Sequence, residues 1–182
     1  GLGYLIDLDG QDQYRSGNMA QGAGYYFGLG VALDLHGDDT RTGGRTSLGA
    51  AGHYGIGLLV DAQGADRYSP SGPKHTLSAA NERSVSLFID AGSGSDAYDL
   101  TRSAGLGDAG TESWSLSIDE GGADRYQGLA GLGHGTADSL GIFFDLAGVD
   151  TYEAQPGAQP AGTTGRGNER TIRATGSLFQ DR

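Results

Sequence analysis

Apolar and polar residues alternate with a period of two in six copies of one stretch, which recur every 26 to 29 residues. Each copy reaches an aspartate, here called the first aspartate, and the residues one, three and five positions before it are apolar in all six copies. The residues between them are mixed, with Gly or Ser four positions before the aspartate. This alternation predicts a short β-strand that ends at the first aspartate and buries its three apolar columns. The copies are Gly1–Tyr14, Gly28–Arg41, Gly55–Tyr68, Ser84–Tyr98, Ser113–Tyr126 and Ser139–Tyr152.

The fixed period predicts the fold class. A repeat of this length cannot bury its apolar face alone and does so by stacking on its neighbours, as in solenoid proteins. The apolar spacing of two, with Gly or Ser inside almost every segment, disfavours helix. We therefore predict an all-β parallel β-solenoid (β-helix) of about 27-residue coils. A weaker column of mostly leucines, thirteen residues before the first aspartate, predicts another side, so that each coil has two or three short strands.

Three segments follow from this interpretation. Residues 1–152 form the repeat solenoid of six full coils, and residues 176–182 begin a seventh. Between them, residues 153–175 are rich in Pro, Gly and Arg and are expected to form an insertion or loop. The chain begins inside one repeat and ends inside another, which suggests a piece of a longer protein. Exposed strand edges at both ends are therefore expected to pair with further coils of a parent chain or with another copy.

A turn with the pattern Asp-x-x-Gly-x-Asp-x-Tyr follows each strand, and its glycine is predicted to have a positive φ. The glycines are Gly10, Gly37, Gly64, Gly94, Gly122 and Gly148. The tyrosine column is broken once, by Arg41 in the second copy. Because an arginine stem can pack at an edge while its head stays in water, this substitution predicts that the tyrosine column lies at an edge of the core.

Composition and charge narrow the possible partners. The net charge of −11 disfavours nucleic acid and anionic membranes, which need a basic face, and favours cations. No window approaches eighteen uninterrupted apolar residues, so we expect no membrane span. The chain has no cysteine, which excludes disulfides and thiolate metal sites.

Stacking of the coils should bring the two aspartates of every copy into two adjacent columns. Neighbouring carboxylates about 4.8 Å apart repel by about 1 kcal/mol in water and by 3–4 kcal/mol at an effective dielectric near 20, so a half-buried column needs donors or cations. Ca²⁺ is a hard cation that takes oxygen ligands in flexible geometry. The candidate ligands are Asp7, Asp12, Asp34, Asp39, Asp61, Asp66, Asp90, Asp96, Asp119, Asp124, Asp145 and Asp150.

These turns resemble the RTX, or haemolysin-type, calcium repeat, which reads Gly-Gly-x-Gly-x-Asp-x-apolar-x. Residues 91–99 (AGSGSDAYD) match it in all but the first glycine, and Gly121–Tyr126 is similar with one position missing. The resemblance covers only the turns, and here the pattern occurs once in about 27 residues instead of every nine. It implies a Ca²⁺-binding β-solenoid whose turns hold the ions.

An alternative explanation needs no metal. Each first aspartate can accept backbone N–H groups of its own turn, and each second aspartate can do the same for the next strand. Asp-x-x-Gly is an ordinary turn sequence, so the sequence leaves metal binding and turn capping equally open.

Catalysis is the less favoured possibility. Parallel β-helices include polysaccharide-cleaving enzymes, and a site of that kind would need Asp108, His134 and Asp138 to converge in a cleft with an arginine. Further candidates are His53, Glu82 and Glu112. Tyr25, Tyr26 and Tyr54 can be interpreted as a sugar-stacking platform or as a packed corner, and Trp114 as a core residue. The four histidines do not show metal spacing, and no nucleophile elbow, P-loop or HExxH motif is present.

The sequence thus favours a non-catalytic, secreted or cell-surface scaffold or adhesive module that Ca²⁺ stabilises at its Asp/Gly turns. Its expected partners are further coils or another copy and, for the alternative, glycans. That alternative is a carbohydrate-binding or polysaccharide-cleaving β-helix.

Overall fold

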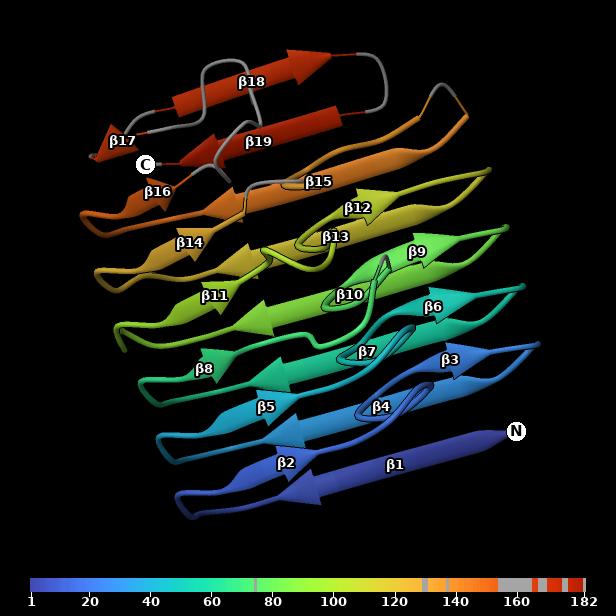
Figure 1. The fold of residues 1–182 in the computed structure, drawn as a ribbon, viewed down its shortest axis with the longest axis horizontal. Coiled ribbons are helices and arrows are strands. Elements are labelled where there is room, and N and C mark those ends of the chain that lie inside the picture. Colours follow the sequence, from blue (N-terminus) through green and yellow to red (C-terminus); the bar gives the residue numbers. More distant parts are fainter. Residues whose placement is uncertain are drawn as a thin grey trace.

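A computed structural model describes residues 1–73, 75–128, 131–136, 138–153, 165–166, 170–174 and 177–181 of the chain. All secondary structure in this part is β. It forms three sheets, in each of which the strands of successive coils stack side by side (Figure 1). The predicted fold class, an all-β parallel β-solenoid with coils of about 27 residues, is confirmed. In the described part, no helix is long and apolar enough to cross a membrane.

The largest sheet has eight strands. Seven of them are parallel, and each aspartate at the end of a strand lies beside the corresponding aspartate of the next coil. In order the strands are β1 (Leu2–Asp7), β4 (Leu29–Asp34), β7 (Ile56–Asp61), β10 (Val85–Asp90), β13 (Trp114–Asp119), β15 (Leu140–Asp145), β19 (Ser177–Asp181) and β18 (Arg170–Ala174). From β1 to β15 the chain makes five turns of the solenoid.

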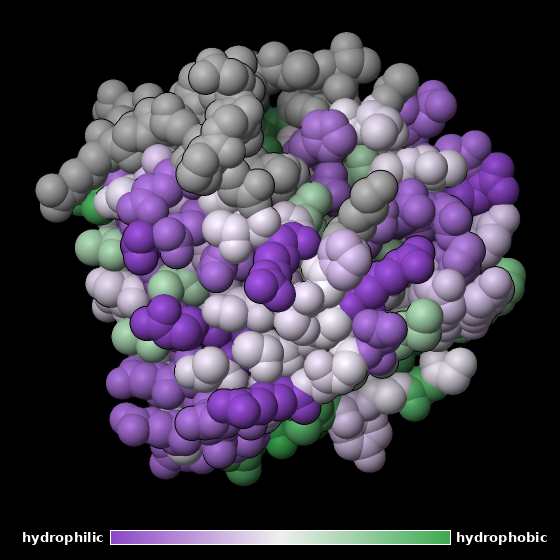
Figure 2. Space-filling view, in the orientation of Figure 1, coloured by the Kyte–Doolittle hydropathy of each residue, from purple (hydrophilic) through white to green (hydrophobic). Residues whose placement is uncertain are grey.

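Two narrower sheets complete the coil. The seven-stranded sheet contains β17 (Gly165–Arg166), β16 (Thr151–Glu153), β14 (Arg125–Gln127), β11 (Ala97–Asp99), β8 (Arg67–Tyr68), β5 (Thr40–Thr42) and β2 (Gln13–Arg15). The four-stranded sheet contains β12 (Asp108–Ala109), β9 (Ala79–Asn81), β6 (Ala51–Gly52) and β3 (Gly24–Tyr25). The first four coils therefore have three strands each. The face that these sheets and their loops present is mainly hydrophilic (Figure 2).

Much of the interval 153–175, which the sequence assigns to an insertion, lies outside the described residues. Within it, β17 pairs antiparallel with β16, and β18 pairs antiparallel with β19. Strand β19 begins the stretch assigned to a further coil and pairs in parallel with β15, with Asp181 opposite Asp145.

The alternation of the long strands faces the other way from the sequence prediction. In β4, Gly30, Ala32 and Asp34 are buried, whereas Leu29, Val31 and Leu33 lie outside, and β7, β10, β13 and β15 repeat the pattern. The prediction that the three apolar columns line the interior is therefore wrong, and we call the surface they form the outer apolar face. It consists of Leu2, Tyr4, Ile6, Leu29, Val31, Leu33, Ile56, Leu58, Val60, Val85, Leu87, Ile89, Trp114, Leu116, Ile118, Leu140, Ile142 and Phe144.

The narrow interior explains this orientation. A Cβ at Gly30 would lie 2.1 Å from the carbonyl oxygen of Ala23, and one at Gly141 would lie 2.0 Å from that of His134. A larger side chain would collide at these glycines, and the inward column four positions before the aspartate holds only glycine or serine. Period two fixes which residues share a face but not which face is inside, because a shift of one residue exchanges the two.

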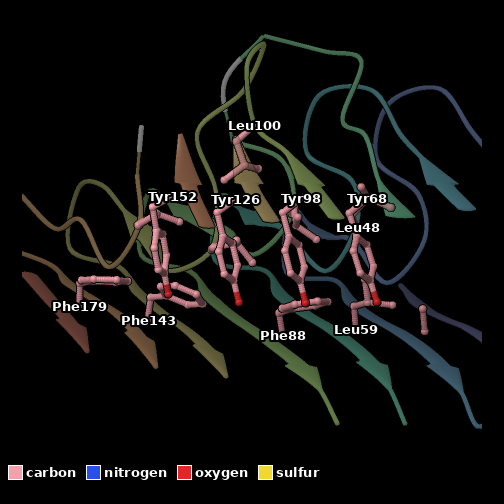
Figure 3. Close-up of a cluster of buried hydrophobic side chains, with 14 residues drawn as sticks. Leu48, Leu59, Tyr68, Phe88, Tyr98, Leu100, Tyr126, Phe143, Tyr152 and Phe179 are labelled. Atoms are coloured by element: carbon pink, nitrogen blue, oxygen red, sulfur yellow. The ribbon is translucent and has the colours of Figure 1, made fainter. Parts of the chain in front are cut away.

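Tyrosines fill the interior. The rings of Tyr68, Tyr98, Tyr126 and Tyr152 stack with centroids 4.8 to 5.1 Å apart, one ring per coil. Figure 3 shows these rings in a row, with their hydroxyl oxygens pointing the same way, toward the long strands. Phe88 and Phe143 of the long strands, among other buried residues, complete this core.

Two placements correct the sequence predictions about the core. The tyrosine column is not at an edge, because its four stacked members and Arg41 are all at most 2% exposed. Trp114 is not a core residue, because it lies on the outer apolar face and is 65% exposed.

The glycines of the turns are required by the stacking of the coils. A Cβ at Gly94 would lie 1.4 Å from the carbonyl oxygen of Gly64, and one at Gly122 would lie 1.8 Å from that of Gly94. The predicted positive φ is found at Gly10, Gly37, Gly64 and Gly148, whereas in the fourth and fifth copies it falls at Gly92 and Gly121 instead. Close approach between coils is therefore the common reason for this column.

Candidate metal centre

The first aspartates point inward because they share a strand face with the small inward column. Tyrosine hydroxyls of the neighbouring sheet donate to them: Tyr126 Oη lies 2.7 Å from Asp119 Oδ2, and Tyr152 Oη lies 2.6 Å from Asp145 Oδ2. Tyr98 Oη lies 2.7 Å from both Asp90 Oδ2 and Asp119 Oδ2. The buried carboxylates therefore have donors from within the core.

One hydroxyl cannot supply a proton to both carboxylates. Tyr98 has a single O–H, which it can donate to one carboxylate. Its other 2.7 Å contact therefore needs a proton on Asp90 or Asp119, or a cation beside them. Tyr14 has the same geometry, at 2.7 Å from Asp7 Oδ2 and 2.8 Å from Asp34 Oδ2. The first aspartates thus carry more negative charge than the tyrosine hydroxyls can satisfy.

The second aspartates form a ladder between coils. The backbone N–H of Asp66 donates to Asp96 Oδ1 at 2.6 Å, and the N–H of Asp96 donates to Asp124 Oδ1 at 2.7 Å. The N–H of Asp124 donates in turn to Asp150 Oδ1 at 2.8 Å, and the ladder begins with the N–H groups of Asp12 and Asp39. One carboxylate oxygen of each accepting aspartate is thereby hydrogen-bonded to the preceding coil.

The two columns meet in four clusters of three buried aspartates, in each of which one ligand oxygen per residue lies within 4.8 Å of the others. The clusters are Asp34, Asp39 and Asp61; Asp66, Asp90 and Asp96; Asp96, Asp119 and Asp124; and Asp124, Asp145 and Asp150. Several oxygens in them are buried without a hydrogen-bond partner, namely Asp61 Oδ1, Asp66 Oδ2, Asp124 Oδ2 and Asp150 Oδ2. A buried acceptor of this kind is costly unless something binds it, so these clusters can hold a metal ion.

Burial and mutual repulsion raise the pKa values of these carboxyls. Burial is the main cause at Asp66, whose pKa rises to about 8, with the charge of Asp61 adding to it. Burial likewise raises the pKa of Asp124 to about 9, helped by the charge of Asp119. The pKa of Asp96 rises to about 7 for the same first reason, and that of Asp90 rises as well. In the absence of a cation, burial and repulsion therefore favour the protonated form of these carboxyls.

Arg41 lies in the first of these clusters. It replaces a tyrosine of the column, and its guanidinium contacts Asp34 Oδ2 at 2.5 Å, Asp61 Oδ2 at 3.2 Å and Asp39 Oδ2 at 3.7 Å. It also lies over the ring of Tyr14, 4.0 Å from the centroid. The chain itself thus places a positive charge among three of these aspartates.

The structure brings ten of the twelve predicted ligands into clusters. Asp7 and Asp12 belong to the first coil, are only half-buried and are in none of the clusters. The alternative explanation is met in part by the first aspartates: Asp119 Oδ1 accepts the N–H of Gly121 in its own turn, at 3.1 Å. The second aspartates instead cap the preceding coil, so capping uses only one oxygen of each residue.

The donor set fits a hard cation. Every ligand of the clusters is a carboxylate, with tyrosine hydroxyls beside them. Among the described residues, no histidine belongs to these clusters. Calcium binds oxygens at about 2.3–2.6 Å, so two ligands on opposite sides of the ion lie about 4.6–5.2 Å apart. The ligand oxygens of each cluster all lie within 4.8 Å of one another, so one such ion can contact all three.

The polar residues considered for catalysis are mostly paired between coils. His53 pairs with Glu82 and Arg83 with Glu112. Asp108 and His134 do converge: His134 Nδ1 lies 2.8 Å from Asp108 Oδ1, beside a cavity of about 480 Å³ that His75 also lines. Among the described residues, neither Asp138 nor an arginine lines this cavity.

The aromatic residues considered for sugar stacking pack on one another. Tyr26 stacks on His53 at 4.6 Å, and Phe27 stacks on Tyr54 at 4.9 Å, so one face of each ring is covered within the protein. Because Tyr26 is still 63% exposed and Tyr54 46% exposed, this packing agrees with both the packed-corner and the sugar-stacking interpretations. Both pairs have positive φ, a backbone conformation that bulky residues seldom adopt and that the sequence did not reveal.

No protein-family model, curated protein or solved structure matches this chain.

Proposed function

We propose that the chain is a calcium-stabilised scaffold module of a secreted or cell-surface protein, with structural or adhesive use. Ca²⁺ ions bind between successive coils, at the three aspartate clusters that lack an arginine. Each ion takes oxygens from both aspartate columns and so joins neighbouring coils. The resemblance of the turns to RTX repeats points the same way.

The observation that carries the proposal is Arg41. Its guanidinium contacts two first aspartates and one second aspartate, at the position that a tyrosine hydroxyl takes in the later coils. In this coil a buried positive charge compensates the aspartates. We infer that the other clusters, which have the same residue type, also require a positive charge. Their orphaned oxygens on Asp66, Asp124 and Asp150 support the same requirement.

Weak calcium binding would favour an extracellular setting. Calcium modules that bind with dissociation constants of about 10⁻⁴–10⁻³ M work outside the cell. Clusters that must first release protons, as Asp66 and Asp124 must at neutral pH, are expected to bind weakly and to need such concentrations.

Thermal unfolding tests the proposal, followed by circular dichroism in excess EGTA and then in millimolar Ca²⁺. At ten times its Kd, each ion adds about 1.4 kcal/mol to the free energy of unfolding, or roughly 3–6 °C to Tm. In Asp96→Asn, which changes two clusters, the calcium-dependent rise should shrink. Asp9→Asn, at an exposed aspartate outside the clusters, is the matched control and should keep the full rise. An unchanged Tm on adding calcium would contradict the proposal.

A second candidate function rests on the cavity beside Asp108 and His134. A carboxylate that orients an imidazole at 2.8 Å, next to about 480 Å³ of space, is an arrangement found in general-base sites. We therefore retain carbohydrate binding or cleavage as the alternative. A glycan array and a polysaccharide-degradation assay, each with His134→Ala as the matched variant, test it. Binding or turnover that this variant abolishes would support the alternative, and its absence on all glycans would remove it.

A further inference from the structure

The outer apolar face is the largest feature that calcium binding leaves unexplained. None of its eighteen residues is charged or carries an amide, and they occupy three in-register columns across six parallel strands. Leu29, Ile56, Val85, Trp114 and Leu140 are each between 38% and 65% exposed, in strands whose other face is packed. Soluble monomers rarely expose contiguous apolar patches above a few hundred Å², and larger patches mark interaction sites.

From these observations we infer that the outer apolar face is the interface of a homodimer, in which it packs against the same face of a second copy of this chain. The inference is independent of the proposed calcium binding, because the face lies on the opposite side of the long strands from the aspartates.

The size of the face suits a second copy. Six residues at about 3.3 Å and six strands at about 4.8 Å give a flat area of roughly 570 Å². Two such faces together cover roughly 1,100 Å², before the relief of the side chains is added, and this reaches the area of about 1,000 Å² expected of a specific interface. The lack of charge also matches the more apolar character of homodimer interfaces.

The face carries an exposed large side chain and a hollow side by side. Trp114 is 65% exposed, and it lines a hollow of about 280 Å³ together with Leu87, Leu116 and Leu140 among others. A two-fold interface uses the same patch on both copies, so a projecting side chain and a hollow on one surface can each meet their counterpart on the other. Equal strand spacing on both copies lets ridges of side chains interdigitate, as in sheets that pack about 10 Å apart.

The opposite side of the molecule does not compete for this role. The face formed by the two narrower sheets and their loops is mainly hydrophilic (Figure 2). Its ion pairs, such as Arg125 with Glu153, are solvent-exposed. Of these two sides of the solenoid, the outer apolar face is therefore the one that a second copy buries.

Sedimentation velocity on the calcium-loaded protein tests the inference over a wide range of protein concentrations. We expect a species of twice the 18.6 kDa chain mass. Trp114 is the single tryptophan, so its emission reports on the interface directly: it should shift to shorter wavelength as the dimer forms. A protein that stays at the chain mass at about 100 μM, with emission typical of exposed tryptophan, would overturn the inference.

Two variants make the test specific. Leu140→Lys puts a charge in the face and should weaken dimerisation at least 100-fold, whereas Gln63→Lys adds the same charge at an exposed turn and should leave it unchanged. Far-ultraviolet circular dichroism checks that both fold. If wild type and Leu140→Lys associate equally, or if the mass grows without limit as in pairing of solenoid ends, the inference is wrong. Trp114 emission in the wild type decides the matter even if Leu140→Lys fails to fold.

Discussion

Replacing Arg41 by tyrosine restores the tyrosine column of the second coil and removes the charge among Asp34, Asp39 and Asp61. At the 3.2 Å that separates its Nε from Asp61 Oδ2, a unit charge pair interacts by about 5 kcal/mol at an effective dielectric of 20. Desolvation offsets part of this, and removing one partner of a buried pair typically destabilises by about 3–5 kcal/mol. We expect Arg41→Tyr to lose that much stability in EGTA.

Calcium should reverse this loss. The cluster of Asp34, Asp39 and Asp61 would then lack an arginine, as do the three clusters that we propose as calcium sites. In saturating Ca²⁺ we expect Arg41→Tyr to approach the stability of wild type within about 1 kcal/mol, and to bind one ion more per chain. Urea unfolding with EGTA or with Ca²⁺, together with native mass spectrometry, measures both quantities.

Arg125→Gln provides the matched control, because Arg125 makes an exposed pair with Glu153, at 2.9 Å. An exposed pair contributes about 0–1 kcal/mol, so this variant should behave like wild type in both buffers. The reasoning fails if Arg41→Tyr is as stable as wild type in EGTA, or if calcium does not restore it and no additional ion is bound.

Four further predictions concern single features. Gly94→Ala should destabilise by at least about 3 kcal/mol or prevent folding, because its Cβ would lie 1.4 Å from the Gly64 oxygen; denaturant unfolding measures this. Tyr98→Phe removes a donor to two buried carboxylates and should cost about 1–3 kcal/mol in the same assay, and an unchanged stability would contradict the assigned contacts. Thr111→Gly should stabilise by about 1 kcal/mol, because it relieves a positive φ of 36° at a β-branched residue, and a lower Tm would argue against that strain. In EGTA, the free energy of unfolding should fall as the pH rises from about 4 to about 9, since the folded chain keeps protons on carboxyls such as Asp124 that the unfolded chain has lost. Each such carboxyl contributes a slope of about 1.4 kcal/mol per pH unit, and stability that rises over this range would refute the assignment.

The period in the sequence was sufficient to predict the solenoid and the pairing of like columns. In-register pairing such as Leu87 with Leu116 and Asp90 with Asp119 follows once copies are aligned and stacked. The sequence could not predict which face of the strand is inside. An alternating strand defines two faces, and the rule that apolar residues are buried chose the wrong one here, because the interior accepts only glycine or serine at one of its columns.

The candidate site was predicted in its residue types but not in its chemistry. The aspartate columns are visible in the sequence, yet their burial, with exposures of 0 to 4% from the second coil to the sixth, is not. The spacing of seven or eight residues between first aspartate and tyrosine was a usable signal for the contact between Tyr126 and Asp119. Arg41 was a second signal, because a cation in a column of hydroxyls indicates neighbouring negative charge.

The most direct test of the account is a count of the calcium ions that the wild-type chain binds, by equilibrium dialysis at pH 7.5 with free Ca²⁺ raised to millimolar levels. We expect three ions per chain at the clusters of the described residues, one for each aspartate cluster without an arginine. Asp96→Asn and Asp124→Asn should bind fewer. A wild-type protein that binds no calcium, or that binds the same number in both variants, would contradict the claim that these buried carboxylates form the cation sites.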